Sequence, residues 1–280
     1  MFAKFFGYEF KETAKMPVLF YIAAIVISLN MGFCVNATMK VHGDIPIYTG
    51  ISTILMVGAV VAVTIGTFSV LIKRYRATMF EDQAYLTHTL PIKRDVIVLA
   101  KLLNSVIWSI FSCIVTAICM ITISLLTASE EIYIYIQLFF RNYEMFNERF
   151  MSVMNCGFVT WVLLSLLFVI VSAVFFYMAI YMCMAIGNLA SKRKRLLSVG
   201  ALFGVWIVVQ TTINTLANAV DFDSILFTRR TIYSDFGYST VILDGFNYPA
   251  LVGLLCAISA IFSVIMYFVN RAIVNKHLNI

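Results

Sequence analysis

Residues 157–187 read GFVTWVLLSLLFVIVSAVFFYMAIYMCMAIG and contain no charged side chain. A helix needs about 20 predominantly apolar residues to cross the roughly 30 Å of hydrocarbon in a bilayer, because it rises about 1.5 Å per residue. This stretch exceeds that requirement, which predicts a span that tilts or a helix that projects past the bilayer.

Five further stretches between charged residues have the same character. The six predicted spans lie near 17–37, 51–72, 97–126, 157–187, 196–219 and 249–270. The whole composition agrees, since 62% of the 280 residues are hydrophobic, 12% are charged and the mean hydropathy is +0.94. Soluble domains are about half apolar and a quarter charged. The sequence therefore predicts an all-α membrane protein with a single transmembrane domain over residues 1–280.

The distribution of Lys and Arg predicts the orientation, because cationic loops resist translocation. With six spans and cytoplasmic ends, fifteen of the 20 basic residues fall on the cytoplasmic side and five on the outside. We therefore expect a multi-pass protein of the cell (inner) membrane with both termini in the cytoplasm. The net charge of +6 flanks the spans, where it orients helices and meets lipid, so nucleic acid is not an expected partner.

The segment 1–15, MFAKFFGYEFKETAK, has aromatic residues and lysines at helical spacing. Such a pattern is typical of an amphipathic helix that lies in the membrane interface; a frayed tail is the alternative. Met16-Pro17 predicts a break before the first span.

The segment 73–95, KRYRATMFEDQAYLTHTLPIKRD, separates spans two and three. Its apolar residues recur at steps of four, seven and four, which predicts a short cytoplasmic helix over 73–91 with one apolar face. Glu81 and Asp82 give it an acidic corner, and Pro91 ends it. Such a helix is either an interfacial spacer or a docking element for a cytosolic partner.

Two outer segments, 128–156 and 220–248, are longer than a turn requires and rich in aromatic residues. We expect them to form compact caps or shallow re-entrant elements at the lipid–water boundary. Mild polar residues inside the spans serve helix packing or line a pathway, and five are candidates for the second role: Asn30, Thr64, Thr67, Gln210 and Asn214.

Several chemistries have no motif in this chain. The sequence has no G-x-x-x-x-G-K-[ST] loop for ATP, no H-E-x-x-H and no nucleophile elbow. The six cysteines are dispersed without a C-x-x-C pair, which predicts neither a disulfide framework nor a zinc site. No acidic or basic residue lies centrally in a predicted span, which disfavours an ion-driven carrier. We expect no catalytic, cofactor or metal site, and no enzyme activity.

One stretch resembles a known family. The run from Glu81 to Arg94, EDQAYLTHTLPIKR, followed by Leu99-Ala100-Lys101-Leu102-Leu103 and Ile107-Trp108, is similar to the segment between spans two and three in the permease subunits of type-2 ABC transporters from bacteria. The Phe-Lys-Glu-Thr before span one and the six-span layout are similar as well. Ala84 departs from the pattern, since these relatives usually have glycine there, and alanine favours continued helix by about 1 kcal/mol.

The resemblance implies a bacterial exporter in which two separate ABC ATPase subunits bind ATP and Mg, and a second permease copy or paralogue completes the pathway. It implies that the 73–91 helix is the coupling element, with these contact residues: Glu81, Asp82, Tyr85, Leu86, Leu90 and Pro91. The expected cargo is amphipathic or hydrophobic, such as a peptide, lipid or drug. Two alternatives stay open: a stand-alone membrane immunity or binding protein that does not pump, and a membrane-embedded enzyme.

Overall fold

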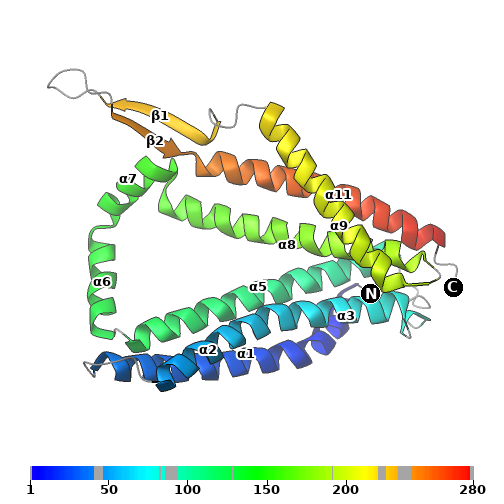
Figure 1. Ribbon diagram of the computed structural model, residues 1–280, viewed down its shortest axis with the longest axis horizontal. Helices are drawn as coiled ribbons and strands as arrows, with labels where there is room; N and C mark the ends of the chain where they lie inside the picture. The colour runs from blue at the N-terminus through cyan, green and yellow to red at the C-terminus, as the bar shows by residue number, and fades with distance from the viewer. Residues whose placement is uncertain are drawn as a thin grey trace. The chain divides into compact units, whose positions relative to one another are not determined.

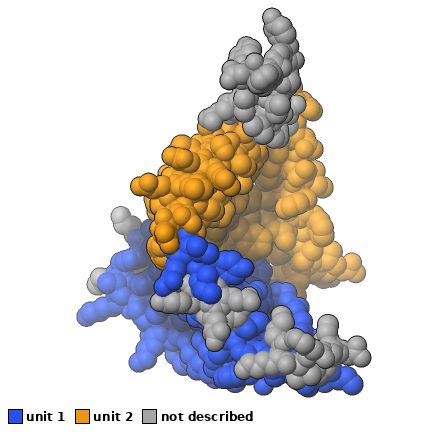
Figure 2. Space-filling model, turned by 90° about the vertical axis from the view of Figure 1, so that its left-hand side faces the viewer, with its two compact units in different colours: residues 1–138, 274–280 blue, residues 139–273 orange. Residues whose placement is uncertain are grey.

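The computed structural model describes residues 2–40, 47–81, 83–85, 94–127, 129–190, 192–219, 225–232 and 241–277. Where the sequence predicts one domain, the chain divides into two compact units, coloured separately in Figure 2. Unit 1 comprises residues 1–138 and 274–280, and unit 2 comprises residues 139–273.

Unit 1 is built from long helices that pack side by side (Figure 1). Helix α1 runs from Phe2 to Lys40 and α5 from Arg94 to Thr127. Between them in sequence, α2 (Ile47–Val61), the π-helical turn η1 (Ala62–Gly66) and α3 (Thr67–Phe80) form one continuous helical stretch.

Contacts at both ends show how these helices run. Glu9 meets Lys101 and Asn36 meets Leu126, so α1 and α5 are parallel along most of their length. Thr38 meets Thr49 and Glu9 meets Arg74, so the α2–η1–α3 stretch runs antiparallel to α1. This is the alternation that three successive spans require.

One sequence prediction about the helices of unit 1 is wrong, and a second is tested only in part. The expected break at Met16-Pro17 does not occur, because α1 continues through a buried Pro17, and its first turns pack on α3 and α5 instead of lying apart as an interfacial helix. The coupling helix predicted over 73–91 falls only in part on described residues: Ala84 and Tyr85 are helical, and residues 82 and 86–91 lie outside the described residues. Residues 73–80 belong to α3, which ends where Glu81 adopts an extended backbone.

Helix α6 (Ser129–Arg141) crosses from unit 1 into unit 2. Unit 2 contains α7 (Tyr143–Met154), α8 (Phe158–Asn188), α9 (Lys194–Ala219) and most of α11 (Tyr248–His277). The outer segment 128–156 is therefore a pair of short helices. The segment 220–248 contains an antiparallel hairpin instead, β1 (Phe227–Ile232) with β2 (Val241–Phe246), in which Phe227 pairs with Phe246 and Ile232 with Val241.

Among the described residues, six helices are long and apolar enough to cross a membrane: Phe2–Thr38, Ile47–Phe80, Asp95–Thr127, Phe158–Asn188, Lys194–Leu216 and Tyr248–Val274. The prediction of six spans is confirmed, and the chain has the build of a multi-pass membrane protein.

Exposed large hydrophobic side chains recur along most of the length of unit 1. They lie from Phe2 to Phe33 on α1, from Ile47 to Ile65 on α2 and η1, and from Leu99 to Leu125 on α5. Between Thr67 and Phe80 none of the described residues exposes one.

Three residues mark one level across these helices. Pro17 lies eight residues after Glu9 on α1, Gly66 lies eight residues before Arg74, and Trp108 lies seven residues after Lys101 on α5. Phe20 covers Gly66 so closely that an added Cβ would lie 2.8 Å from its ring. The stretches 17–38, 47–66 and 108–127 each have the roughly 20 residues that hydrocarbon requires. Beyond this level stand 2–16, 67–80 and 94–107, which we call the stalk.

Candidate functional site: a buried ion cluster in the stalk

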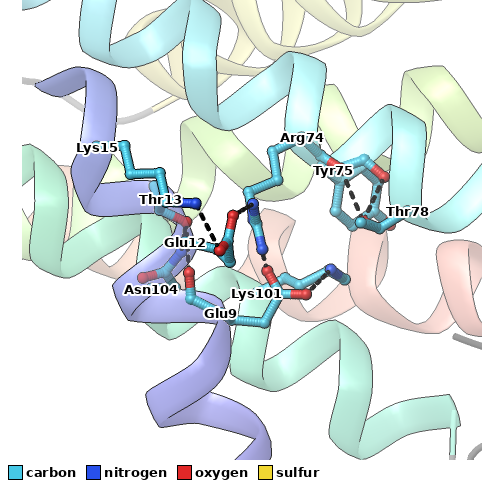
Figure 3. A network of polar contacts seen from close by, with 9 residues as sticks. All are labelled: Glu9, Glu12, Thr13, Lys15, Arg74, Tyr75, Thr78, Lys101 and Asn104. Carbon is cyan, nitrogen blue, oxygen red and sulfur yellow. Dashed lines mark hydrogen bonds and ion pairs between the residues drawn. The ribbon is translucent and has the colours of Figure 1, made fainter. Parts of the chain in front are cut away.

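Glu9 lies at the centre of the stalk, between α3 and α5 (Figure 3). Its Oε2 accepts a hydrogen bond from Arg74 Nε at 2.9 Å, and its Oε1 accepts one from Lys101 Nζ at 2.7 Å. Only 5% of the Glu9 side chain and 4% of the Lys101 side chain are exposed, against 20% for Arg74. One carboxylate therefore joins three helices that are distant in sequence.

Further contacts surround Glu9 and Lys101 on α1 and α5. Thr13 Oγ1 donates to the Glu9 carbonyl at 2.7 Å and accepts from Asn104 Nδ2 at 2.9 Å. The Phe5 ring centroid lies 5.8 Å from Lys101 Nζ, within the range of a cation–π contact. The cluster is thus held from both sides, and its members have little freedom to rearrange singly.

Aromatic rings close the cluster toward the lipid level. Phe2, Phe6 and Phe10 stack successively along α1, and Phe10 stacks on Trp108 at 5.0 Å between centroids. Tyr21 continues this contact, because its hydroxyl lies 3.1 Å from the Trp108 carbonyl oxygen and is hydrogen-bonded to Ser112 Oγ at 2.8 Å. Of the phenylalanines that predicted an interfacial helix, Phe10 packs on Trp108 and Phe111 of α5, and Phe5 lies over Lys101.

A second set of ion pairs rims the cluster. Glu12 pairs with Lys15 at 2.7 Å and approaches Arg74 at 3.8 Å. At the end of α3, Arg76 Nε pairs with Glu81 Oε1 at 2.8 Å. These pairs are partly exposed, and pairs in water contribute little to stability.

The contacts of this cluster give it a mechanical role, which is to hold three helices in a fixed arrangement. Glu9 already accepts from two cations, and no group of three or more His, Cys, Asp or Glu that could hold a metal occurs in the described part of the chain. A buried, fully paired carboxylate fixes the geometry of its partners. The cluster therefore links the N-terminal turns of α1 to the end of α3 and the start of α5, the two helices that flank residues 81–93.

The structure accounts for part of the predicted coupling face. Tyr75 and Met79, which contributed to the apolar stripe, are buried inside the protein and offer no surface to a partner. Tyr85 is 67% exposed, and Glu81 is half exposed. Asp82, Leu86, Leu90 and Pro91 lie outside the described residues.

The predicted pathway residues do not form one site within unit 1. Asn30 is exposed and its Oδ1 accepts from Ser52 Oγ at 3.2 Å. Thr64 lies in the π-helical turn and donates to the Val60 carbonyl, while Thr67, one turn on, is buried. Gln210 and Asn214 belong to α9 in unit 2, where both are exposed.

Unit 2 holds an aromatic cluster where α7 meets α8. Rings from Phe139, Phe146, Phe150, Phe158 and Trp161 pack with centroids 5.1 to 6.1 Å apart. Asn147 Oδ1 accepts from the Phe158 backbone N–H at 2.9 Å, and this bond fixes the corner. The aromatic residues predicted for an outer boundary thus form a packed corner.

Sequence reasoning did not single out Glu9 and counted Arg74 and Lys101 only as orienting charges. The sequence does contain two indications of this cluster: Glu9 is an acid within a mostly basic N-terminal segment, and Lys101 is a lysine within an apolar run. No family model, curated protein or solved structure matches the chain.

Proposed function

We propose that this chain is the membrane-spanning permease subunit of an ATP-driven exporter of the bacterial cell membrane, which moves an amphipathic or hydrophobic cargo outward. Two ABC ATPase subunits supply the energy and bind the ATP and Mg, and a second permease copy or paralogue completes the pathway. Six spans and the resemblance of residues 81–108 to type-2 permeases support this function.

The observation that carries the proposal is the position of the Glu9 cluster. A partner that pushes on residues 81–93 acts on the end of α3 and the start of α5 at once. Glu9 binds Arg74 of α3 and Lys101 of α5, so these two helices and the stalk part of α1 are linked directly. An alternating-access switch needs such a rigid coupling, because small shifts at an effector site are transmitted through packed elements.

The direct test is co-purification with candidate ATPases, followed by measurement of ATPase stimulation in lipid. We expect the double variant Leu86→Asp plus Leu90→Asp to lose association with the ATPase, because each change places a charged carboxylate where an apolar side chain would contact the partner. Tyr85→Ala is expected to weaken association by a smaller factor, since it removes one exposed aromatic contact.

A matched control is Lys192→Ala, an exposed position in the loop between α8 and α9, which is expected to bind the ATPase normally. Unchanged association of the Leu86/Leu90 variant, with normal folding and membrane insertion, would reject the coupling role. Turnover or cargo protection that persists without any ATPase would favour the stand-alone alternatives.

A further inference from the structure

The connection between α8 and α9 carries a dense positive charge. Four consecutive basic residues occupy it and the start of α9: Lys192, Arg193, Lys194 and Arg195. All four are exposed, and none belongs to an ion pair among the described residues. We call these four residues the basic turn. No acidic residue occurs between Glu148 and Asp221 or after Asp244, so neither α8 nor α9 nor α11 supplies an acid that could balance it.

The backbone holds the basic turn in one position. Gly187, near the end of α8, packs so closely on α9 that an added Cβ would lie 2.7 Å from the Lys194 carbonyl oxygen. Arg193 adopts a left-handed backbone with a φ of 58°, and its carbonyl oxygen accepts from the Leu196 N–H at 3.0 Å. Lys194 Nζ donates to Asn188 Oδ1 at 3.0 Å. The chain therefore reverses tightly, and the four basic residues lie together at the end of the two helices.

The length of α9 places the basic turn at the level of lipid headgroups. The stretch of α9 that can span a membrane, Lys194–Leu216, has 23 residues, which corresponds to about 34 Å of helix. Hydrocarbon is about 30 Å thick, and the headgroup layers bring the total to about 40–45 Å. A span of this length leaves its first residues among the headgroups. Leu196 and Leu197 follow directly and are 66% and 44% exposed, so apolar surface adjoins the charge.

An anionic phospholipid has the chemistry that complements this arrangement. Arginine binds phosphate oxygens through a bidentate fork, and lysine binds them as a point charge. The N-terminus of α9 adds the partial positive charge of its unpaired N–H groups. Clusters of four or more basic residues directly beside a membrane helix attract anionic lipids. No residue of Lys194–Leu216 is buried, so the acyl chains of the same lipid can lie along α9.

We propose that the basic turn is a binding site for the headgroup of an anionic phospholipid, whose acyl chains contact the exposed face of α9. The proposal needs only that the chain is a multi-pass membrane protein in which α9 is a span. It is therefore independent of the proposed transport function, and failure of one leaves the other standing.

The test measures contact between lipid and Trp206, which lies on α9 and is 68% exposed. Trp206 follows Lys194 by twelve residues, or about 18 Å of helix, which places it near the acyl chains of the same leaflet. The purified full chain is reconstituted in phosphatidylcholine vesicles with increasing amounts of phosphatidylglycerol that has brominated acyl chains. Brominated phosphatidylcholine is the comparison. Bromine quenches tryptophan fluorescence at short range, and a Trp206→Phe variant gives the contribution of the other two tryptophans.

We expect brominated phosphatidylglycerol to quench Trp206 at a mole fraction at least about fivefold lower than brominated phosphatidylcholine, because the basic turn attracts its headgroup. The triple change Lys192→Gln, Lys194→Gln and Arg195→Gln is expected to abolish this preference. The double change Lys192→Arg and Lys194→Arg keeps the charge and is expected to keep the preference.

A matched control removes three exposed charges from unit 1 instead, and it is expected to behave as the unaltered chain: Lys4→Gln, Lys11→Gln and Lys73→Gln. Equal quenching of the unaltered chain by the two lipids would reject the site. A preference that survives the triple change, or that the control loses equally, would assign it to the overall charge of the protein and reject the basic turn. Loss of the preference in the double arginine variant would contradict a role for charge. Inorganic phosphate at constant ionic strength should leave the preference intact, and its loss would make the ligand a soluble anion.

Discussion

A carboxylate with 5% of its side chain exposed needs cationic neighbours, and Glu9 has two. The pair with Lys101 is as buried as Glu9 itself, whereas Arg74 also reaches Glu12 at the rim. Removing the carboxylate leaves the Lys101 ammonium buried without its acid, and breaking a buried pair by removing one partner costs about 3–5 kcal/mol. The cluster is therefore more sensitive to loss of one member than to loss of the whole pair.

Glu9→Gln is expected to lower the melting temperature of the detergent-solubilised protein clearly, because Lys101 keeps its charge without a counter-ion. Adding Lys101→Met to Glu9→Gln is expected to recover part of the loss, since the buried charge is then gone. Glu12→Gln, at the exposed rim, serves as the control and should change little. Equal losses from Glu9→Gln and Glu12→Gln would contradict a central role for Glu9.

The residues of this cluster could not be paired from the sequence. Glu9 is separated from Arg74 by 65 residues and from Lys101 by 92, and no local pattern connects positions at such distances. What the sequence does predict correctly at this scale is the sign of the charge near the spans. Burial, which turns an orienting lysine into a structural one, depends on the packing of three helices.

At the scale of the elements, α1 is the clearest difference from prediction. Proline cannot donate the hydrogen bond that the Thr13 carbonyl would accept, and a break was therefore expected. The helix continues because both sides of Pro17 are held, by Glu9 and Phe10 before it and by Tyr21 after it. Likewise, 73–80 has helical periodicity, but its apolar face packs inward as the end of α3.

The corner between α7 and α8 allows a prediction about thiol reactivity. Cys156 is buried there, and burial raises the pKa of its thiol. The reactive form is the thiolate, so a higher pKa means slower alkylation at a given pH and a steeper gain as the pH rises. A Ser152→Cys variant places a thiol at an exposed position one turn earlier and is expected to react much faster.

The measurement is labelling of intact cells with a membrane-impermeant maleimide between pH 7 and 9. Rapid labelling of the position-152 thiol would also support the predicted outer location of α7, and a cysteine at Lys192 is the cytoplasmic comparison. Rapid reaction of Cys156 at pH 7 would show that the corner is open. Labelling at 192 but not at 152 would reverse the predicted orientation.

At the scale of the whole molecule, composition predicts the number of spans well, because each apolar run exceeds the length that hydrocarbon requires. Composition does not predict where the bilayer ends. Residues 96–107 read VIVLAKLLNSVI and 67–72 read TFSVLI, and both are apolar enough to be assigned to spans. In the structure most of these side chains are buried in the stalk, so apolar sequence that packs helices together there cannot be told from sequence that faces lipid.

Leu99 and Ile118 can distinguish a packed stalk from a continued span, because both are aliphatic side chains on α5 with similar exposure. Leu99 is 46% exposed and Ile118 is 44% exposed. The predicted span 97–126 would place both in lipid, whereas the level of Pro17, Gly66 and Trp108 places Leu99 about 13 Å beyond the hydrocarbon. Spin labels at the two positions, in vesicles, are expected to differ. Dissolved oxygen should enhance the spin relaxation of the label at 118, and a water-soluble nickel chelate should not. The label at 99 should show the reverse.

Tyr8 and Val26 on α1 form a matched pair, in which a label at 8 should behave as the label at 99 and a label at 26 as the label at 118. If the label at 99 is protected from nickel as strongly as the label at 118, the stalk lies within the bilayer, and the Glu9 cluster is an intramembrane ion cluster.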